Sequence, residues 1–186
     1  YLALKTELTP RQHDYVSKIH SAAKSLLAII NDILDFSKVE AGKLELEEGR
    51  FRVEDVAGNS LSLLRQRAHE KDIELLFDVA EPRLLGESGA LMGDALRLGQ
   101  VLTNLLSNAV DAQTDVADPR FVIDLVVTGD EVVLSFADGG PGFDGNVLAH
   151  AYEPYVTTKA KGTGLGLAIV KKIIDEHGGR VTLDNP

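Results

Sequence analysis

The feature that most constrains this fold is a helical pattern of unusual length. Over residues 9–40 apolar side chains recur mostly at spacings of three and four, with Thr9 as a candidate N-cap and Pro10 at the first helical position. At 1.5 Å per residue such a helix is about 45 Å long. A small domain cannot bury so long a stripe alone, so we expect a partner helix. A helix packed only on its own chain is the alternative.

We expect residues 1–5 to be the end of that partner helix and residues 6–8 to be the turn, with most of the partner outside the chain. The unusual first residue, Tyr1, indicates a piece of a longer protein. The 186 residues suffice for one sizeable domain and an appendage. We place the boundary near Gly42, which separates a partial helical hairpin (1–42) from a globular domain (43–186).

Composition excludes several classes of function. The absence of cysteine rules out disulfides and thiolate metal sites, and the reducing cytoplasm fits best. A net charge of −10 argues against a nucleic-acid or anionic-membrane surface, because phosphate backbones attract basic stripes. No apolar run approaches the ~20 residues of a membrane span, and the first residues lack a signal-peptide pattern.

The pattern after the long helix predicts an α+β fold, a two-layer sandwich whose mostly antiparallel mixed sheet has helices on one face. The expected helices occupy residues 54–71, residues 94–112 and a segment from Gly166 onward. The expected extended segments are residues 44–47, 51–53, 73–79, 121–127, 132–137 and 180–183, and residues 80–92 are expected to be a loop.

Polar residues share one face of the expected 94–112 helix, beside its apolar stripe. They are Gln100, Asn104, Asn108 and Asp111, at spacings of four, four and three. Amides so close to a core either bond internally or face a ligand, and an asparagine oxygen is a suitable ligand for Mg²⁺. Both interpretations stay open on this pattern alone.

Two glycine-rich segments suggest a nucleotide. Gly162, Gly164 and Gly166 precede an apolar helical pattern, where free backbone N–H groups suit phosphate oxygens, although such glycines can also be simple caps. The segment fits neither the P-loop nor the dinucleotide-binding template. Asp138 follows a strand directly and could accept a hydrogen bond from an exocyclic amine, with room for a flat base beside Gly140. A ligand-free turn is the alternative.

Four motifs together resemble the ATP-binding domain of sensor histidine kinases of two-component systems. In order they are Asn-Leu-Leu-Ser-Asn-Ala (104–109), Asp-x-Gly-x-Gly (138–142), Tyr-Glu-Pro-Tyr with Thr-Thr-Lys (152–159) and Gly-Thr-Gly-Leu-Gly (162–166). Residues 12–46 resemble the second helix of that family's dimerisation hairpin. The first part of the match resembles hybrid kinases and residues 152–179 resemble nitrogen-regulation kinases, which leaves a chimeric chain open.

The resemblance implies the sandwich shared with type II topoisomerases and heat-shock chaperones, and it implies Mg-ATP as the bound nucleotide. The γ-phosphate would pass to a histidine outside this chain and then to the aspartate of a response regulator. Asn104, Asn108 and Lys159 are the candidate catalytic residues, with Asn108 as the Mg²⁺ ligand. The candidate ATP-binding residues are Asn108, Asp111, Asp138, Gly140, Gly142, Tyr155, Thr158, Lys159, Gly162, Thr163, Gly164, Leu165 and Gly166. Residues 143–161 would form a mobile lid.

Three departures from the family pattern stand out. Asp111 occupies a position where many members have a basic residue, and an acid there repels phosphate unless it faces the metal or a neighbouring base; its role stays open. Nothing matches the family's phosphoacceptor box, and the histidines are expected to be ordinary surface residues: His13, His20, His69, His150 and His177. The chain also ends before the strands that usually close the sheet.

The implied partners are a second copy through the N-terminal helix and the receiver domain of a response regulator, without nucleic acid. A membrane would be reached only through upstream regions outside the chain, so the expected location is the cytoplasm or the cytoplasmic portion of a membrane-bound sensor. Two alternatives are a nucleotide-binding scaffold without phosphotransfer and an ATPase of the topoisomerase or chaperone type. The long helix disfavours the latter, as does Asn104, since those enzymes tend to place a glutamate there.

Overall fold

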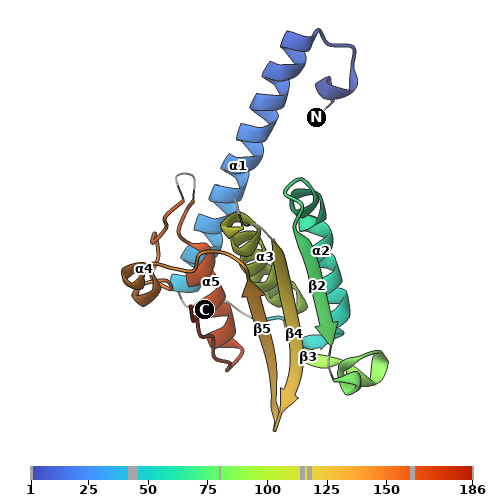
Figure 1. Ribbon diagram of the computed structural model, residues 1–186, viewed down its shortest axis with the longest axis vertical. Coiled ribbons are helices and arrows are strands. Elements are labelled where there is room, and N and C mark those ends of the chain that lie inside the picture. Colours follow the sequence, from blue (N-terminus) through green and yellow to red (C-terminus); the bar gives the residue numbers. More distant parts are fainter. Residues whose placement is uncertain are drawn as a thin grey trace. The chain divides into compact units, whose positions relative to one another are not determined.

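The computed structural model describes residues 2–41, 46–79, 81–113, 116, 119–159 and 162–185, without the side chains of residues 38 and 39. The chain divides into two compact units, Tyr1–Lys43 and Leu44–Pro186 (Figure 1). The expected helix end at Gly42, the first half of the expected strand 44–47 and the last two residues of the expected lid lie outside the described residues. No helix in the described part of the chain is both long and apolar enough to cross a membrane.

The first unit consists of a 3₁₀ turn, η1 (Ala3–Lys5), and the long helix α1 (Pro10–Glu40). A reciprocal capping box starts α1: the backbone N–H of Gln12 donates to Thr9 Oγ1 at 3.3 Å, and the N–H of Thr9 donates to Gln12 Oε1 at 3.0 Å. The helix therefore begins where the sequence predicts. Six large apolar residues of α1 remain 44–68% exposed: Ile19, Leu26, Leu27, Ile30, Ile33 and Leu34.

The described residues of the second unit form two sheets. In the three-stranded sheet, the central strand β4 (Arg120–Thr128) runs parallel to β2 (Glu74–Val79) and antiparallel to β5 (Glu131–Asp138). A separate antiparallel pair joins β1 (Gly49–Phe51) to β3 (Leu91–Gly93). The helices of this unit are α2 (Val53–His69), α3 (Ala95–Ala112), α4 (Gly145–Ala149) and α5 (Gly166–Glu176), with the 3₁₀ turns η2 (Pro82–Leu84) and η3 (Glu87–Gly89).

The core lies between the three-stranded sheet and the helices α2 and α3. Alternate residues of β4, Phe121, Ile123 and Leu125, are buried, as the period of two requires. The α3 stripe packs against Phe121 and Ile123 through Leu102 and Leu106, in one cluster. Helix α5 in turn contacts α3, and its own stripe is buried. The sequence prediction of a two-layer sandwich with a mixed sheet is thus confirmed.

Asp94 fixes the start of α3. One carboxylate oxygen accepts the N–H of Arg97 at 3.0 Å, as an N-cap does, and the other accepts the N–H of Glu47 at 3.0 Å. Burial disfavours the charged form, but these backbone hydrogen bonds outweigh it and hold the pKa of Asp94 below its ordinary value. The cap therefore also joins the segment before β1 to the helix that organises this unit.

Several local predictions are wrong. The segments concerned either have no strand to pair with among the described residues or are too short to show a sequence pattern. Residues 46–48 are coil and the strand forms at β1 instead, while Val53 already belongs to α2. The expected loop 80–92 contains η2, η3 and most of β3, because three residues are too few to show alternation. The expected strand 180–183 is coil, since no described residue pairs with it in a ladder.

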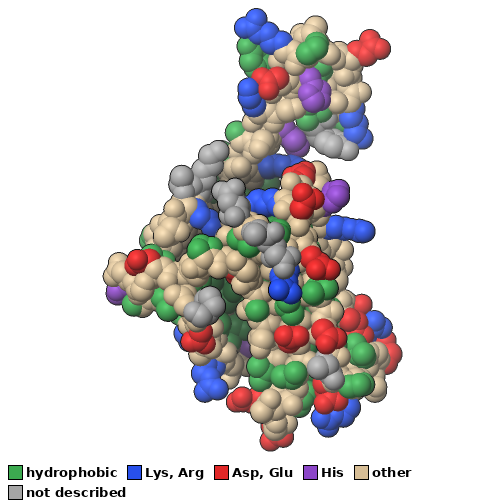
Figure 2. Space-filling model, viewed as in Figure 1, with side chains coloured by type: hydrophobic (Ala, Val, Ile, Leu, Met, Phe, Trp, Pro, Cys, Tyr) green, Lys and Arg blue, Asp and Glu red, His purple; other side chains and the backbone are tan. Residues whose placement is uncertain are grey.

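Acidic and basic side chains are interspersed on the face of the second unit drawn in Figure 2, with apolar side chains between them. The net charge of −10 is therefore not concentrated on one region of this face. An anion bound there would depend on local donors and cations.

Candidate functional site

Helix α3 is the centre of the candidate site, because three other segments reach it in order along its length. Asn104 Nδ2 donates to the carbonyl oxygen of Gly166 at 3.4 Å, and Lys159 Nζ donates to Asn108 Oδ1 at 2.8 Å. At the end of the helix, a Cβ placed on Gly140 would lie 3.0 Å from the Cβ of Ala112. The start of α5, the segment with Lys159 and the loop after β5 thus converge on one helix.

The start of α5 lacks a side-chain cap. Its N-cap residue, Leu165, is buried and apolar, and no side chain accepts a hydrogen bond in the N-cap arrangement. Just before it, the hydroxyl of Thr163 accepts the N–H of Leu165 at 3.3 Å. The first N–H groups of a helix carry partial positive charge, and an anion can satisfy them where a side chain does not. Asn104 lies beside this end of α5.

Gly164 joins the glycine segment to the backbone of Tyr155. Its φ is +67°, and a Cβ there would lie only 2.5 Å from the carbonyl carbon of Tyr155, so no other residue fits. The N–H of Tyr155 donates to the carbonyl oxygen of Gly164 at 3.0 Å. Tyr155 itself has a φ of +67°, which is strained for a residue with a side chain, and its ring is largely exposed.

Asp138 is the last residue of β5, and the loop that follows bonds to its side chain. Its Oδ1 accepts the N–H of Gly140 at 2.8 Å, a hydrogen bond within the turn itself. A Cβ on Gly140 would lie 2.7 Å from this oxygen, so a side chain there would displace the carboxylate. The exposed carboxylate keeps its second oxygen available to an outside donor.

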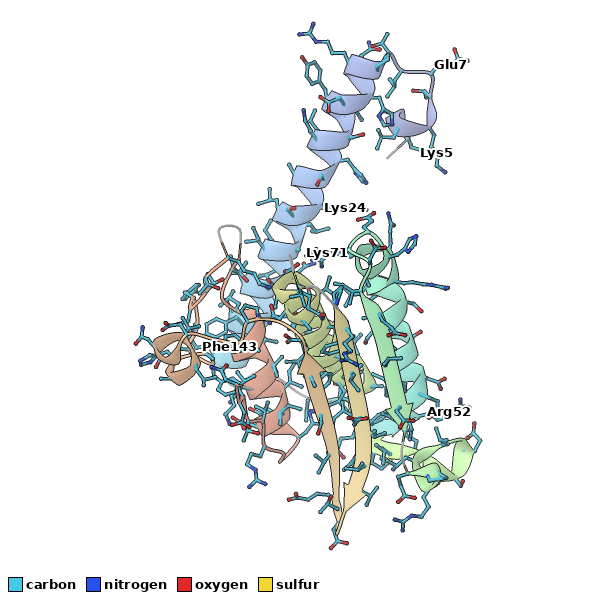
Figure 3. All side chains as sticks on the ribbon, in the orientation of Figure 1. Lys5, Glu7, Lys24, Arg52, Lys71 and Phe143 are labelled. Atoms are coloured by element: carbon cyan, nitrogen blue, oxygen red, sulfur yellow. The ribbon has the colours of Figure 1, made fainter. Side chains whose placement is uncertain are left out.

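Asn185 holds the far end of this loop. Its side chain accepts the N–H of Phe143 at 2.8 Å and donates to the carbonyl oxygen of the same residue at 2.7 Å. Phe143 is labelled in Figure 3, on the segment that leads to α4. The expected lid therefore starts at a residue bonded on both backbone groups, and it contains the short helix α4, which the sequence analysis missed because five residues show no period.

Asp111 lies between two cations. Its Oδ2 is 2.8 Å from Lys159 Nζ, and its Oδ1 is 2.6 Å from Arg67 Nη2. The Nη1 of Arg67 also donates to Ser107 Oγ at 3.0 Å. The acid left unexplained by the sequence therefore faces basic groups.

Sequence reasoning missed Arg67, because it comes from α2, 44 residues before Asp111. The one available signal was the basic end of α2. In the turn after α2, Lys71, labelled in Figure 3, donates to the carbonyl oxygen of Val110 at 2.9 Å.

The donors around Asn108 fit a magnesium ion that is shared with phosphates. The described residues hold no group of three or more His, Cys, Asp or Glu side chains that could form an all-protein cage. Mg²⁺ commonly takes one or two protein ligands and completes its shell with waters and phosphate oxygens. Asn108 Oδ1 already faces a cation, the Lys159 ammonium, at 2.8 Å. A cation therefore reaches this oxygen, and a metal bound there would take the place of the ammonium on Asn108.

The contacts show which of the predicted site residues lie together. Asn104, Asn108, Asp111, Lys159 and Gly166 are brought together directly, and Asp138 and Gly140 lie at the Ala112 end of the same helix. Three other predicted residues, two glycines and a threonine, are not part of these direct contacts. A Cβ on Gly162 would lie 2.5 Å from Thr157 Oγ1, Gly142 has a φ of +74°, and Thr158 is exposed. The hydroxyl that accepts the N–H of Lys159, at 3.1 Å, belongs to Thr157 rather than to Thr158.

His177 is not an ordinary surface histidine, which corrects the expectation. It is half-buried, its Nε2 accepts the N–H of Asp94 at 3.1 Å, and its Nδ1 lies 2.8 Å from the carbonyl oxygen of Ile173. These two bonds assign the proton to Nδ1. His177 therefore links the end of α5 to the start of α3. His150, by contrast, pairs with Glu153 at 2.8 Å on the surface.

Two family models match the chain. Residues 93–186 match the family described as histidine kinase-, DNA gyrase B-, and HSP90-like ATPase, and residues 2–42 match the His Kinase A (phospho-acceptor) domain. The sensor protein GacS of Pseudomonas syringae pv. syringae is 37% identical over 100% of this chain and 21% of the relative. The histidine-protein kinase BarA of Escherichia coli (strain K12) is 36% identical over 97% and 20%.

Solved structures show the same likeness. Full-length ShkA in complex with AMPPNP has a TM-score of 0.77 and 32% identity, covering 94% of this chain and 36% of that one. The catalytic domain of ThkA has a TM-score of 0.65 and 29% identity, covering 77% and 89%. The chain spans about a fifth of the length of the curated relatives. The family resemblance predicted from the motifs is confirmed: the chain belongs to the histidine kinase-, DNA gyrase B- and HSP90-like ATPase family, and within it to the sensor histidine kinases.

Proposed function

We propose that this chain is the catalytic, ATP-binding part of a sensor histidine kinase, joined to the second helix of its dimerisation hairpin. Residues 43–186 bind Mg-ATP, and residues 1–42 contribute to the dimer. The γ-phosphate passes to a histidine outside residues 1–186 and then to a response regulator's aspartate. The observation that supports this most is that three segments converge on α3: the start of α5, the segment with Lys159 and the loop after β5.

Asp138 is the proposed adenine contact. One of its oxygens is engaged by the N–H of Gly140, which fixes the carboxylate, and the other can accept the exocyclic amine of the base. Gly140 and Gly142 leave the adjacent backbone without side chains, so a flat ring can approach it. Because the loop abuts Ala112, the base would lie at the C-terminal end of α3.

The phosphates are proposed to lie between the start of α5 and the middle of α3. The N–H groups at the start of α5, which has no side-chain cap, and the ammonium of Lys159 supply positive charge, and Asn104 supplies an amide beside them. Bound Mg²⁺ would neutralise phosphate charge, with Asn108 as its protein ligand. Phosphoryl transfer depends mainly on such positioning and neutralisation, which these residues can provide.

The proposed dimer rests on α1. Its apolar stripe is exposed along much of its length, and residues 2–42 match a phospho-acceptor domain model. A second copy of the chain, together with the first helix of the dimerisation hairpin, would cover this stripe. The receiver domain of a response regulator is the proposed partner for phosphate relay, as the family assignment suggests, and any membrane attachment would lie in regions outside this chain.

Transfer in trans tests the proposed function. Residues 1–186 would be mixed with Mg²⁺, radiolabelled ATP and a separate phosphoacceptor helix taken from a GacS-like relative. We expect acid-labile phosphate on the supplied helix and none on the chain itself. Tight ATP binding without transfer would instead identify a nucleotide-binding scaffold, and steady ATP hydrolysis without an acceptor would identify an ATPase. The Asp138→Asn variant is the control that should lose labelling.

A further inference from the structure

The cluster of Arg67, Asp111, Lys159 and Asn108 suggests a role for the acid that departs from the family pattern. We infer that Asp111 is a positioning residue that holds the ammonium of Lys159 beside Asn108. The cation that serves the phosphates then comes from Lys159, in the segment before the glycines. In many family members a basic residue on the helix that corresponds to α3 stands at the position of Asp111 instead. This inference rests on the proposed function, and it assigns Asp111 a role in binding Mg-ATP.

The first support is the direction in which the carboxylate is held. Arg67 donates to Oδ1 of Asp111 and, through its other nitrogen, to the hydroxyl of Ser107 one turn earlier on α3. The guanidinium is planar and its donors are fixed relative to one another, so two partners on one helix restrain the carboxylate. Its second oxygen, Oδ2, is the one that lies 2.8 Å from Lys159 Nζ.

The second support is that Lys159 is held at both ends. Its N–H donates to Thr157 Oγ1 at 3.1 Å and its carbonyl oxygen accepts the N–H of Gly162 at 3.0 Å. Its ammonium contacts Asp111 Oδ2 and Asn108 Oδ1, both at 2.8 Å. A free lysine side chain samples many rotamers, and restricting it before the ligand arrives improves affinity.

The charge balance explains how an acid can occupy this position. Asp111 contributes one negative charge, and Arg67 and Lys159 contribute two positive charges within hydrogen-bonding distance of it. The cluster is therefore net positive toward a phosphate. All three side chains are 31–46% exposed, so the ion pairs add little to folding stability, and the effect of Asp111 should show in nucleotide binding.

The test is a double-mutant cycle on Mg-ATP affinity with Asp111→Asn and Lys159→Met, measured by calorimetry. Asp111→Asn keeps the shape and removes the charge, and it should weaken binding roughly tenfold. Lys159→Met should weaken binding at least as much, and adding Asp111→Asn to it should have no further effect, because the two residues act together. Asp111→Glu should recover part of the affinity.

Asp175→Asn is the matched control, since it removes another exposed carboxylate that pairs with a lysine, Lys171, outside the site. It should leave Mg-ATP affinity unchanged, and thermal unfolding of every variant shows that the fold is kept. Unchanged or tighter binding by Asp111→Asn would overturn the positioning role, as would additive effects in the cycle. Absence of Mg-ATP binding by the unmutated chain would overturn the proposed function itself.

Discussion

α1 and α3 are both long amphipathic helices, yet their apolar side chains have opposite exposure. Leu106 of α3 is fully buried and Leu102 nearly so, against a sheet from the same unit. Leu27 and Ile30 of α1 stay about half exposed. The same period of 3.6 therefore has two outcomes: in Leu44–Pro186 it builds a core within one chain, and in Tyr1–Lys43 it leaves an apolar stripe largely exposed.

This difference has a physical consequence for every substitution. A change in the core or site of the second unit acts within one chain, so its effect is independent of protein concentration. In the proposed dimer, a change on the apolar stripe of α1 acts on association, so its effect should depend on concentration and on the partner helix supplied. The predictions below use this contrast.

The largest expected effect is on the core of the second unit. Leu106→Ala should lower the free energy of unfolding by about 2–5 kcal/mol, because it removes a fully buried side chain and leaves a cavity. Denaturant unfolding followed by circular dichroism measures this loss. Leu27→Ala is the matched control on α1, and equal destabilisation by the two substitutions would contradict the contrast between the helices.

Asp138→Asn should act on binding alone. Losing a hydrogen bond that the adenine amine donates to a charged carboxylate should weaken ATP binding by about 1.5–3 kcal/mol. The preference for adenine over guanine should also fall. Stability should hardly change, because the side chain is exposed. Titration with ATP and GTP measures both quantities. ATP affinity equal to that of the unmutated chain would remove Asp138 from the site.

The Asp94 cap should show a pH dependence. Because its pKa in the folded chain is lowered, its stabilisation is complete above the unfolded pKa of about 3.9 and is lost as the pH falls through the lower folded value. Asp94→Ala should lower the free energy of unfolding by about 1–2 kcal/mol at pH 7, with a smaller difference at pH 2 to 3. A difference that stays constant over this range would show that the charge is irrelevant.

The smallest effect on unfolding is expected on α1. Ile30→Ala should change the free energy of unfolding of the second unit by less than about 0.5 kcal/mol, as exposed positions do. It should instead weaken association with a supplied first helix, measured by sedimentation at several concentrations. If unfolding changes and association does not, α1 packs on its own chain, the alternative that its pattern left open.

The sequence predicted those parts of the structure that depend on residues close together in the chain. The polar face of α3 follows from spacings of four, four and three, and the N-cap at Thr9 follows from the residues that start α1. Strands β4 and β5 follow from two runs of alternating, β-rich residues. For the same reason the order of the four motifs indicated the family before any geometry was known.

The remainder depends on pairs that are distant in the chain. Arg67 meets Asp111 across 44 residues, and His177 accepts the N–H of Asp94 across 83 residues. Neither pair leaves a period or spacing in the sequence. Strands β1 and β3 have three residues each and, among the described residues, pair with one another alone, so they have no alternation long enough to detect. The role of Asp111 therefore required the structure.

The most direct test of the central claim is the magnesium dependence of ATP binding in Asn108→Ala. Calorimetric titration of the unmutated chain and of this variant, each with Mg²⁺ and with EDTA, separates the metal-dependent part of the affinity. We expect Mg²⁺ to strengthen binding to the unmutated chain and to have no such effect on Asn108→Ala, whose fold should be intact. Equal enhancement by Mg²⁺ in both proteins would contradict the assignment of the polar face of α3 as the Mg-ATP site.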